Sequence, residues 1–305
     1  MKNITKWQHI VPRFYLKEFK NEKNLIEIYD IIKKKFNPPK GTKPLCAEYF
    51  YYAAETGIQD TISQEVEAFF QNYETPISNF IPFIKEIVLG NSEITFDEKY
   101  ILSLLMSMLY LRNNKTRSHI KHLTSDISSK TLKGILNVKG KDRFFSDYER
   151  DTGIIIDQKE RDEFLLNLEK DFFKIEVDNI PHIEFLSKIP NFANLLCSQN
   201  WIIYISRIDE NFITSDTPII SKNLENWDTQ FGVPALAKSY FFSLTPKIFI
   251  RTYYDTQNTK KATKRKNLYN LSDAKIVKEL NTIIAINSEK LLFGRKQLDL
   301  KKVLT

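Results

Sequence analysis

The 305-residue sequence is poor in glycine and in cysteine, and each shortage excludes a class of protein. Only 8 glycines occur, and neither the GxGxxG nor the GxxxxGK pattern of phosphate-binding loops is present. The two cysteines, Cys46 and Cys197, lie far apart and belong to no motif. This usage is typical of a reduced, cytoplasmic protein, and together with only 4 histidines it disfavours a zinc enzyme.

Long apolar runs are also missing. The longest apolar-dominated run, ILSLLMSMLYL at 101–111, is shorter than the roughly 20 residues that span a bilayer. The N-terminal stretch MKNITKWQHIVPRF has no apolar segment of the kind found in a secretory signal. We therefore expect a cytoplasmic protein that does not engage a membrane.

The composition is otherwise that of a globular protein, with 42% hydrophobic and 27% charged residues and with 22 phenylalanines and 14 tyrosines available for a core. The net charge is +7, and the excess is concentrated in RNNKTRSHIKH (112–122) and KKATKRK (260–266), neither of which contains an acid. This modest excess permits contact with nucleic acid or another phosphate-bearing anion but does not require it. His119 and His122 have the spacing of two metal ligands on one helix face, but the surrounding cations would repel a metal.

Alternation and helical periodicity predict the secondary structure. LIEIYD followed by KKKFNPP predicts a hairpin over 25–36, and the apolar positions of 61–89 predict one long amphipathic helix. Thr95 and Glu98 have capping-box spacing before a helix whose segment 101–111 is apolar nearly all round, as in a central helix. Further helices are expected at 115–130, 158–175 and 182–197, with a long connection at 137–157.

The C-terminal third changes to strands. WIIYISRI (201–208) and FITSDTPII (212–220) predict a hairpin, and YFFSLTPKIFIRTYY (240–254) predicts strand structure with a turn or edge at Pro246. Ser272 is expected to cap a helix that ends near 287, before a last strand at KLLFG. We therefore predict an α+β fold in a single domain, 1–305: one sheet built from the N-terminal and C-terminal strands, with a mainly helical insertion at about 58–198.

The acid within FITSDTPII is the first candidate site residue. Asp216 would lie at a strand end, flanked by Ser215, where a buried sheet delivers side chains to a cleft. The alternative is an Asx-turn or cap, in which the carboxylate bonds nearby backbone N–H groups.

Two arginines and a histidine complete the candidate site. His9 precedes a helix that Pro12 would start, and Arg13 in its first turn calls for a nearby carboxylate or phosphate. Arg112 lies on the core-facing line of its helix and needs a carboxylate or an anionic ligand. The alternatives are that His9 packs against Trp7 and that both arginines reach solvent.

Three of these stretches resemble a bacterial and fungal family known only as a domain of unknown function, number 4238. The stretches are QHIVPRFYLKEF, FITSDTPII and YFFSLTPKIFI, which match the family patterns H-x-x-P-R-x-x-L-x-x-F, S-D-x-P and a strand followed by L-x-P. The closing helix is also similar, with Asn281 at a recurrent asparagine. The resemblance implies no established chemistry, but its motifs include His9, Arg13, Ser215 and Asp216.

Two functions fit these observations. One is a phosphate-directed hydrolase, either nuclease-like or nucleotide-processing. In it, Arg13 and Arg112 would bind the anion and His9 would act as acid or base. Asp216 would orient His9 or bind Mg²⁺. The other is a non-catalytic, basic binding or interaction module in which the same residues are structural. The basic stretch 260–266 is either a solvated loop or helix approach, or a segment that contacts phosphate through charge alone. Its candidate binding residues are Lys260, Lys261, Lys264 and Arg265.

Overall fold

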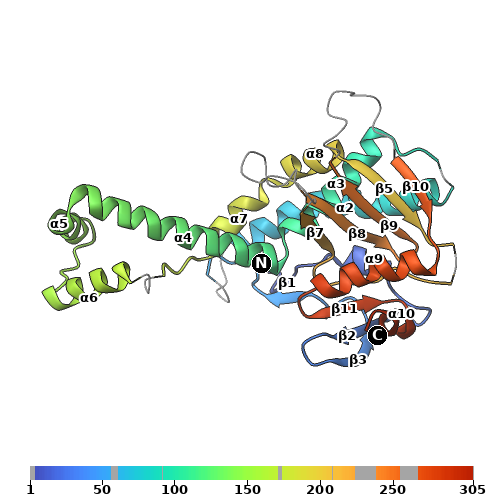
Figure 1. Ribbon diagram of the computed structural model, residues 1–305, viewed down its shortest axis with the longest axis horizontal. Coiled ribbons are helices and arrows are strands. Elements are labelled where there is room, and N and C mark those ends of the chain that lie inside the picture. Colours follow the sequence, from blue (N-terminus) through green and yellow to red (C-terminus); the bar gives the residue numbers. More distant parts are fainter. Residues whose placement is uncertain are drawn as a thin grey trace.

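The computed structural model describes residues 4–55, 61–90, 92–170, 174–207, 209–223, 238–254 and 267–304. It has the predicted α+β composition with a helical middle, as Figure 1 shows. The prediction of one sheet is wrong, because the described strands form three sheets of two, four and five strands.

The N-terminal strands are divided between the two smaller sheets. β1 (Trp7–His9) pairs antiparallel with β4 (Ala47–Tyr49), and the short helix α1 (Arg13–Lys17) follows Pro12 as predicted. The predicted hairpin is confirmed as β2 (Ile26–Asp30) and β3 (Lys35–Lys40). This hairpin belongs to the four-stranded sheet, whose order β3-β2-β11-β6 is completed by two late strands, β11 (Leu291–Gly294) and β6 (Thr214–Ser215).

The five-stranded sheet consists of strands from the C-terminal third, in the order β10-β5-β9-β8-β7. Its pairs are antiparallel except that β10 runs parallel to β5. The strands are β5 (Asn200–Ile205), β7 (Ile219–Asn223), β8 (Lys238–Thr245), β9 (Ile248–Tyr253) and β10 (Asn267–Leu271). The β8–β9 hairpin turns at Pro246, where the sequence predicts a turn.

The predicted hairpin between 201–208 and 212–220 is wrong. β5 pairs with β9 and β10, and the segment 212–220 divides between two sheets, with β6 in one and β7 in the other. Pro218 lies between the two short strands. Since proline has no N–H and a restricted φ, it ends the pairing of one strand before the next begins.

Helices cover both faces of the five-stranded sheet. On one face lie α2 (Thr61–Leu89), α3 (Phe96–Leu111) and α8 (Ile189–Ser198), in one core with Trp201 and Ile203 of β5. On the other lies α9 (Ala274–Asn287), in a second core with Tyr204 and Phe249. The predicted capping box of Thr95 and Glu98 opens α3, whereas α9 is capped by Asp273, not Ser272. The short α10 (Gln297–Leu304) ends the described chain.

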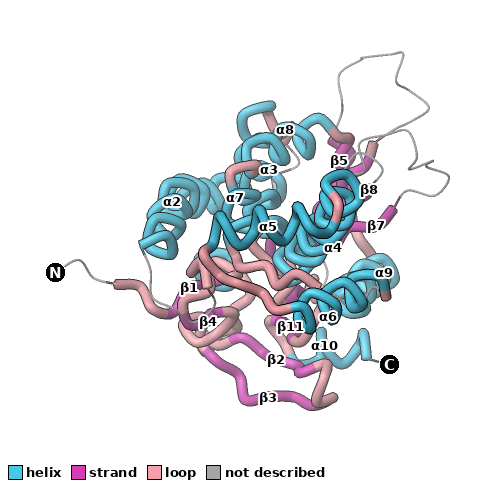
Figure 2. Tube along the Cα trace, turned by 90° about the vertical axis from the view of Figure 1, so that its left-hand side faces the viewer, coloured by secondary structure: helices cyan, strands magenta, loops and turns pink. Residues whose placement is uncertain are grey.

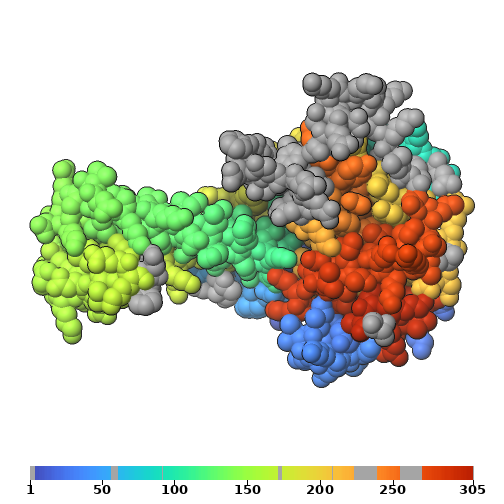
Figure 3. Space-filling model, in the orientation of Figure 1, coloured from blue at the N-terminus to red at the C-terminus, as the bar shows by residue number. Residues whose placement is uncertain are grey.

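Three helices form an arm that projects from this body, as the ribbon and the space-filling view show (Figures 1 and 3). They are α4 (Asn114–Lys139), α5 (Lys141–Thr152) and α6 (Gln158–Glu169). The expected long connection at 137–157 is therefore wrong, because only Gly140, with φ +81°, separates α4 from α5. α7 (Ile180–Leu186) lies beside α4. In Figure 2 the arm is seen end-on, with its helices in front of the body.

None of the helices within the described ranges combines the length and the apolar character needed to cross a membrane.

Candidate functional site

Asp216 joins the end of β6 to the turn before β11. Its carboxylate accepts the backbone N–H groups of Glu289, Lys290 and Leu291 at 3.3, 2.8 and 3.1 Å. Its own N–H donates to the Leu291 carbonyl at 3.1 Å. Burial raises the pKa of Asp216 to about 6, against the effect of these three N–H donors. The geometry is that of a backbone cap, which is the structural alternative considered from sequence.

The neighbouring motif residues form a buried network around Tyr15. The Tyr15 hydroxyl lies 2.6 Å from Oγ1 of Thr214 and donates to the Ser243 carbonyl at 2.7 Å. Ser243 in turn donates its hydroxyl hydrogen to the Ile213 carbonyl at 2.6 Å. The network therefore links α1, β6 and β8. These elements lie far apart in the sequence, and each belongs to one of the three stretches that resemble the family.

The side chains of two other motif residues are also bonded to backbone. Asn281 accepts from the N–H of Ile213 and donates to the carbonyl of Asn211, both at 2.9 Å. Ser215 is fully buried, and its hydroxyl oxygen accepts the N–H of Thr217 at 3.1 Å. These contacts fix the chain just before and just after β6, the strand at one edge of the four-stranded sheet.

The structure brings His9, Arg13 and Arg112 near one another but does not join them to Asp216. His9 Nε2 lies 3.1 Å from the Lys43 carbonyl, and burial lowers the pKa of His9, as do the charges of Arg13 and Arg112. Arg13 is exposed. Arg13 and Asp216 both lie in described ranges, and no ion pair or hydrogen bond joins them. Sequence predicted one site containing His9, Arg13 and Asp216; the geometry gives His9 and Asp216 separate backbone partners.

Arg112 is buried, with 1% of its surface exposed, and is surrounded by protein partners. It donates to Glu74 at 2.7 Å, to the Tyr52 hydroxyl at 2.9 Å and to the His9 carbonyl, and its guanidinium lies over the Phe70 ring at 4.1 Å. The sequence predicts a carboxylate or an anionic ligand for this arginine, and Glu74 supplies the carboxylate.

The two stretches that stand out in the sequence meet elsewhere, in a pocket of about 290 Å³ between the start of α4 and β7. The acid-free stretch 112–122 and the end of FITSDTPII supply most of its wall. The described lining consists of Tyr110, Asn113, Lys115, Thr116, His119, Ile120, Phe185, Thr217, Ile219, Ile220 and Ser221. This lining contains two basic side chains and no carboxylate.

Hydrogen bonds hold the polar wall of this pocket in place. The Asn113 side chain caps α4 by accepting the N–H of Thr116 at 2.8 Å, and the Thr116 hydroxyl donates to the Tyr110 carbonyl at 2.7 Å. The Tyr110 and Ser221 hydroxyl oxygens lie 3.4 Å apart. The first turn of α4, where N–H groups lack intrahelical partners and the helix dipole favours an anion, thus contributes to the pocket.

Among the described lining residues, Thr217 alone has a buried side-chain polar atom without a hydrogen-bond partner. Its side chain is 2% exposed, and its Oγ1 is buried without a hydrogen-bond partner. A buried hydroxyl without a partner is unfavourable unless a bound molecule satisfies it. Sequence reasoning stopped at Asp216 and missed Thr217, although the same motif contains both.

Two other sequence predictions concern a cluster of basic residues and a metal ion. Lys260, Lys261, Lys264 and Arg265 lie outside the described residues. Within the described ranges, no three His, Cys, Asp or Glu side chains gather where they could hold a metal ion. At Asp216, three backbone N–H groups already occupy three of the roughly four lone-pair positions of the carboxylate, which leaves about one for Mg²⁺.

A family model described as a protein of unknown function, DUF4238, matches residues 7–297. No curated protein and no solved structure matches the chain.

Proposed function

Because the chain belongs to the DUF4238 family, for which no function is known, we propose its function from the chemistry of the pocket. The protein is a basic, non-catalytic binding module that takes up a small phosphate-bearing anion between α4 and β7. The single observation that carries this proposal is the buried, unpartnered hydroxyl of Thr217 in a pocket whose described lining has basic side chains and no carboxylate.

Each part of the pocket suits an anion. The exposed side chains of Lys115 and His119 lie on successive turns of α4; Lys115 provides a positive charge, and both provide N–H donors. The first turn of α4 adds the positive end of the helix dipole. The Thr217 hydroxyl would donate the hydrogen that no protein acceptor takes. Phe185, Ile219 and Ile220 form an apolar wall against which an organic part of the ligand would pack.

The hydrolase alternative receives less support from the geometry. Catalysis by His9, Arg112 and Asp216 would require each to leave a protein partner, namely the Lys43 carbonyl, Glu74 and the 289–291 backbone. A binding module in which these residues stabilise the fold requires no such exchange.

Calorimetric titration of the full chain with inorganic pyrophosphate tests the proposal. We expect the Lys115→Gln/His119→Gln variant to bind at least tenfold more weakly, since hydrogen bonds to a charged group contribute about 1.5–3 kcal/mol each. The Lys17→Gln control removes one exposed lysine from α1, outside the pocket lining, and should bind like the wild type. Equal weakening in the control would show binding by overall charge alone and would contradict the proposal.

Thr217→Val separates a ligand-binding role from a packing role. Valine has nearly the same shape but no hydroxyl, so the ligand-free variant should be as stable as the wild type or more stable. Its pyrophosphate affinity should nevertheless fall. A variant that loses stability without ligand, or that binds pyrophosphate as the wild type does, would remove Thr217 from the site.

A further inference from the structure

The tip of the arm has a second concave surface, which we call the tip groove. It has a volume of about 600 Å³ and lies between the end of α4, α5 and α6. Its apolar wall consists of Leu132, Phe144, Phe145, Tyr148, Ile156 and Phe164. Glu160 and Glu163 lie beside these aromatic residues. The helices α5 and α6, which line the groove, lie at the far end of the arm from β7 (Figure 1), so the inference is independent of the proposed function.

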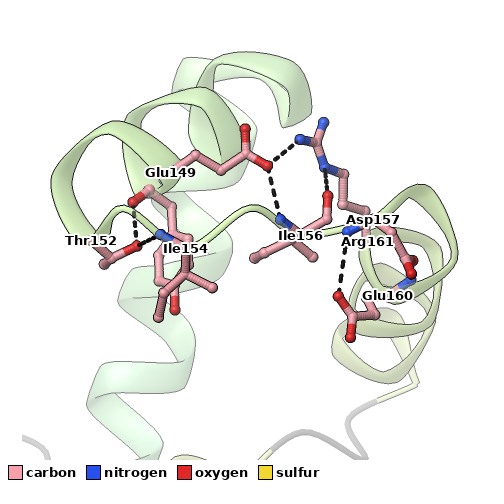
Figure 4. A network of polar contacts seen from close by, with 8 residues as sticks. Glu149, Thr152, Ile154, Ile156, Asp157, Glu160 and Arg161 are labelled. Carbon is pink, nitrogen blue, oxygen red and sulfur yellow. Dashed lines mark hydrogen bonds and ion pairs between the residues drawn. The ribbon is translucent and has the colours of Figure 1, made fainter.

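The connection between α5 and α6 is fixed by hydrogen bonds, as Figure 4 shows. The Glu149 carboxylate accepts the N–H of Ile156 at 3.0 Å and pairs with Arg161 at 2.5 Å. Arg161 also donates to the Ile156 carbonyl at 3.0 Å. Asp157 and Glu160 form a capping box at the start of α6. The tip is therefore preorganised, which lowers the entropy lost when a partner binds.

The aromatic wall is held in the same way. Phe145 lies edge-on to Phe144 and Phe164, with ring centroids 5.4 and 5.8 Å away. The guanidinium of Arg161 lies over the Phe145 ring, 5.1 Å from its centroid. The two residues that precede Ile156 of the groove wall are apolar and exposed: Ile155 is 86% exposed and Ile154 is 56% exposed. Adjacent exposed apolar groups of this kind mark interaction surfaces.

The charge of the tip is opposite to that of the whole chain. Residues 141–169 contain nine acidic and five basic residues, a net charge of −4, whereas the chain as a whole carries +7. Glu163, beside the groove, is exposed. A partner that fits this surface must combine large apolar side chains with basic ones.

We propose that the tip groove binds a basic amphipathic helix of a partner protein, with its apolar face on the phenylalanines and its lysines or arginines beside Glu163. A helix is the favoured form because the walls are helices, whose backbone groups are bonded internally and offer no edge for an added strand. The arm holds this groove away from the body, so a partner helix reaches it without contacting the sheets (Figure 3).

Fluorescence anisotropy with the full chain tests this proposal. The probe is a labelled synthetic peptide of about 16 residues, long enough for roughly four helical turns, with leucines on one face and lysines on the other. A second peptide replaces every lysine by glutamate. We expect the Leu–Lys peptide to bind and the Leu–Glu peptide to bind at least tenfold more weakly.

Variants assign the binding to the groove. Glu163→Lys should weaken binding of the Leu–Lys peptide roughly fivefold, as for a rim charge, and Tyr148→Ser should weaken it roughly tenfold by removing an aromatic anchor. Glu86→Lys, an exposed acid on α2 of the body, is the matched control and should not change binding. Equal effects of Glu163→Lys and Glu86→Lys, or equal binding of the two peptides, would overturn the proposal. So would sedimentation of the wild type as a dimer that Glu163→Lys dissociates, since the occupant would then be a second copy of the chain.

Discussion

Glu67→Gln on α2 should stabilise the protein above neutral pH. Glu67 lies beside the buried Arg112, yet its Oε1 is buried without a hydrogen-bond partner in the described structure. Burial raises the pKa of Glu67 to about 7, and the Arg112 charge only partly opposes this effect. The ionised carboxylate is therefore unfavourable in the folded state, and glutamine preserves its shape without the charge.

The sign and size of the effect follow from linkage. The folded state holds a proton on Glu67 up to about pH 7, whereas the unfolded chain releases it near 4.5. Between these values the folded state binds more protons, so the stability of the wild type falls as pH rises. At about 1.4 kcal/mol for each pKa unit, the full difference is about 3 kcal/mol. We expect the variant and the wild type to be similar at pH 4.5 and to differ by about that amount, in favour of the variant, at pH 8.

Urea denaturation at pH 4.5, 6, 7 and 8 measures this difference. Each curve must be compared with the wild type, because His182, whose pKa burial lowers to about 4, changes stability in the opposite direction over the same range. Glu65→Gln is the matched control: Glu65 is exposed on the same helix, and its replacement should leave the curves unchanged. A Glu67→Gln protein that is less stable than the wild type at pH 8, or equally displaced at every pH, would refute the reasoning.

Three further changes test the motif residues and the basic stretch. Asp216→Asn should leave the protein folded but destabilise it by about 1–3 kcal/mol, because an amide cannot accept all three N–H groups. Unchanged stability together with lost pyrophosphate binding would instead show that Asp216 takes part in anion binding. Tyr15→Phe should lose about 1–2 kcal/mol in thermal or urea unfolding, since Thr214 and the Ser243 carbonyl lose their buried partner, and an unchanged midpoint would contradict this. Replacing Lys260, Lys261, Lys264 and Arg265 together by Glu should abolish retention of a single-stranded oligonucleotide in a gel-shift assay, and wild-type binding should weaken steeply with salt; salt-independent binding would remove nucleic acid as a partner.

The sequence by itself determined those parts of the structure that depend on neighbours along the chain. The apolar period of 61–89 predicted α2, the spacing of Thr95 and Glu98 predicted the cap of α3, and LIEIYD with its turn predicted the β2–β3 hairpin. Each is set by interactions within a few residues, which a sequence displays directly. The sequence also showed that Asp216 could have either of two roles, a backbone cap in a turn or a residue of a functional site.

Only the tertiary structure decided which segments pair and what the buried charges contact. β6 and β7 are separated by three residues, yet they enter different sheets and pair with β11 and β8. Strand partners are chosen by long-range packing, and the composition of one strand does not encode its neighbour. For the same reason the acid-free stretch 112–122 and Thr217 could not be placed in one pocket from sequence. They come together only when the folded chain places the start of α4 and the segment before β7 on the walls of one pocket.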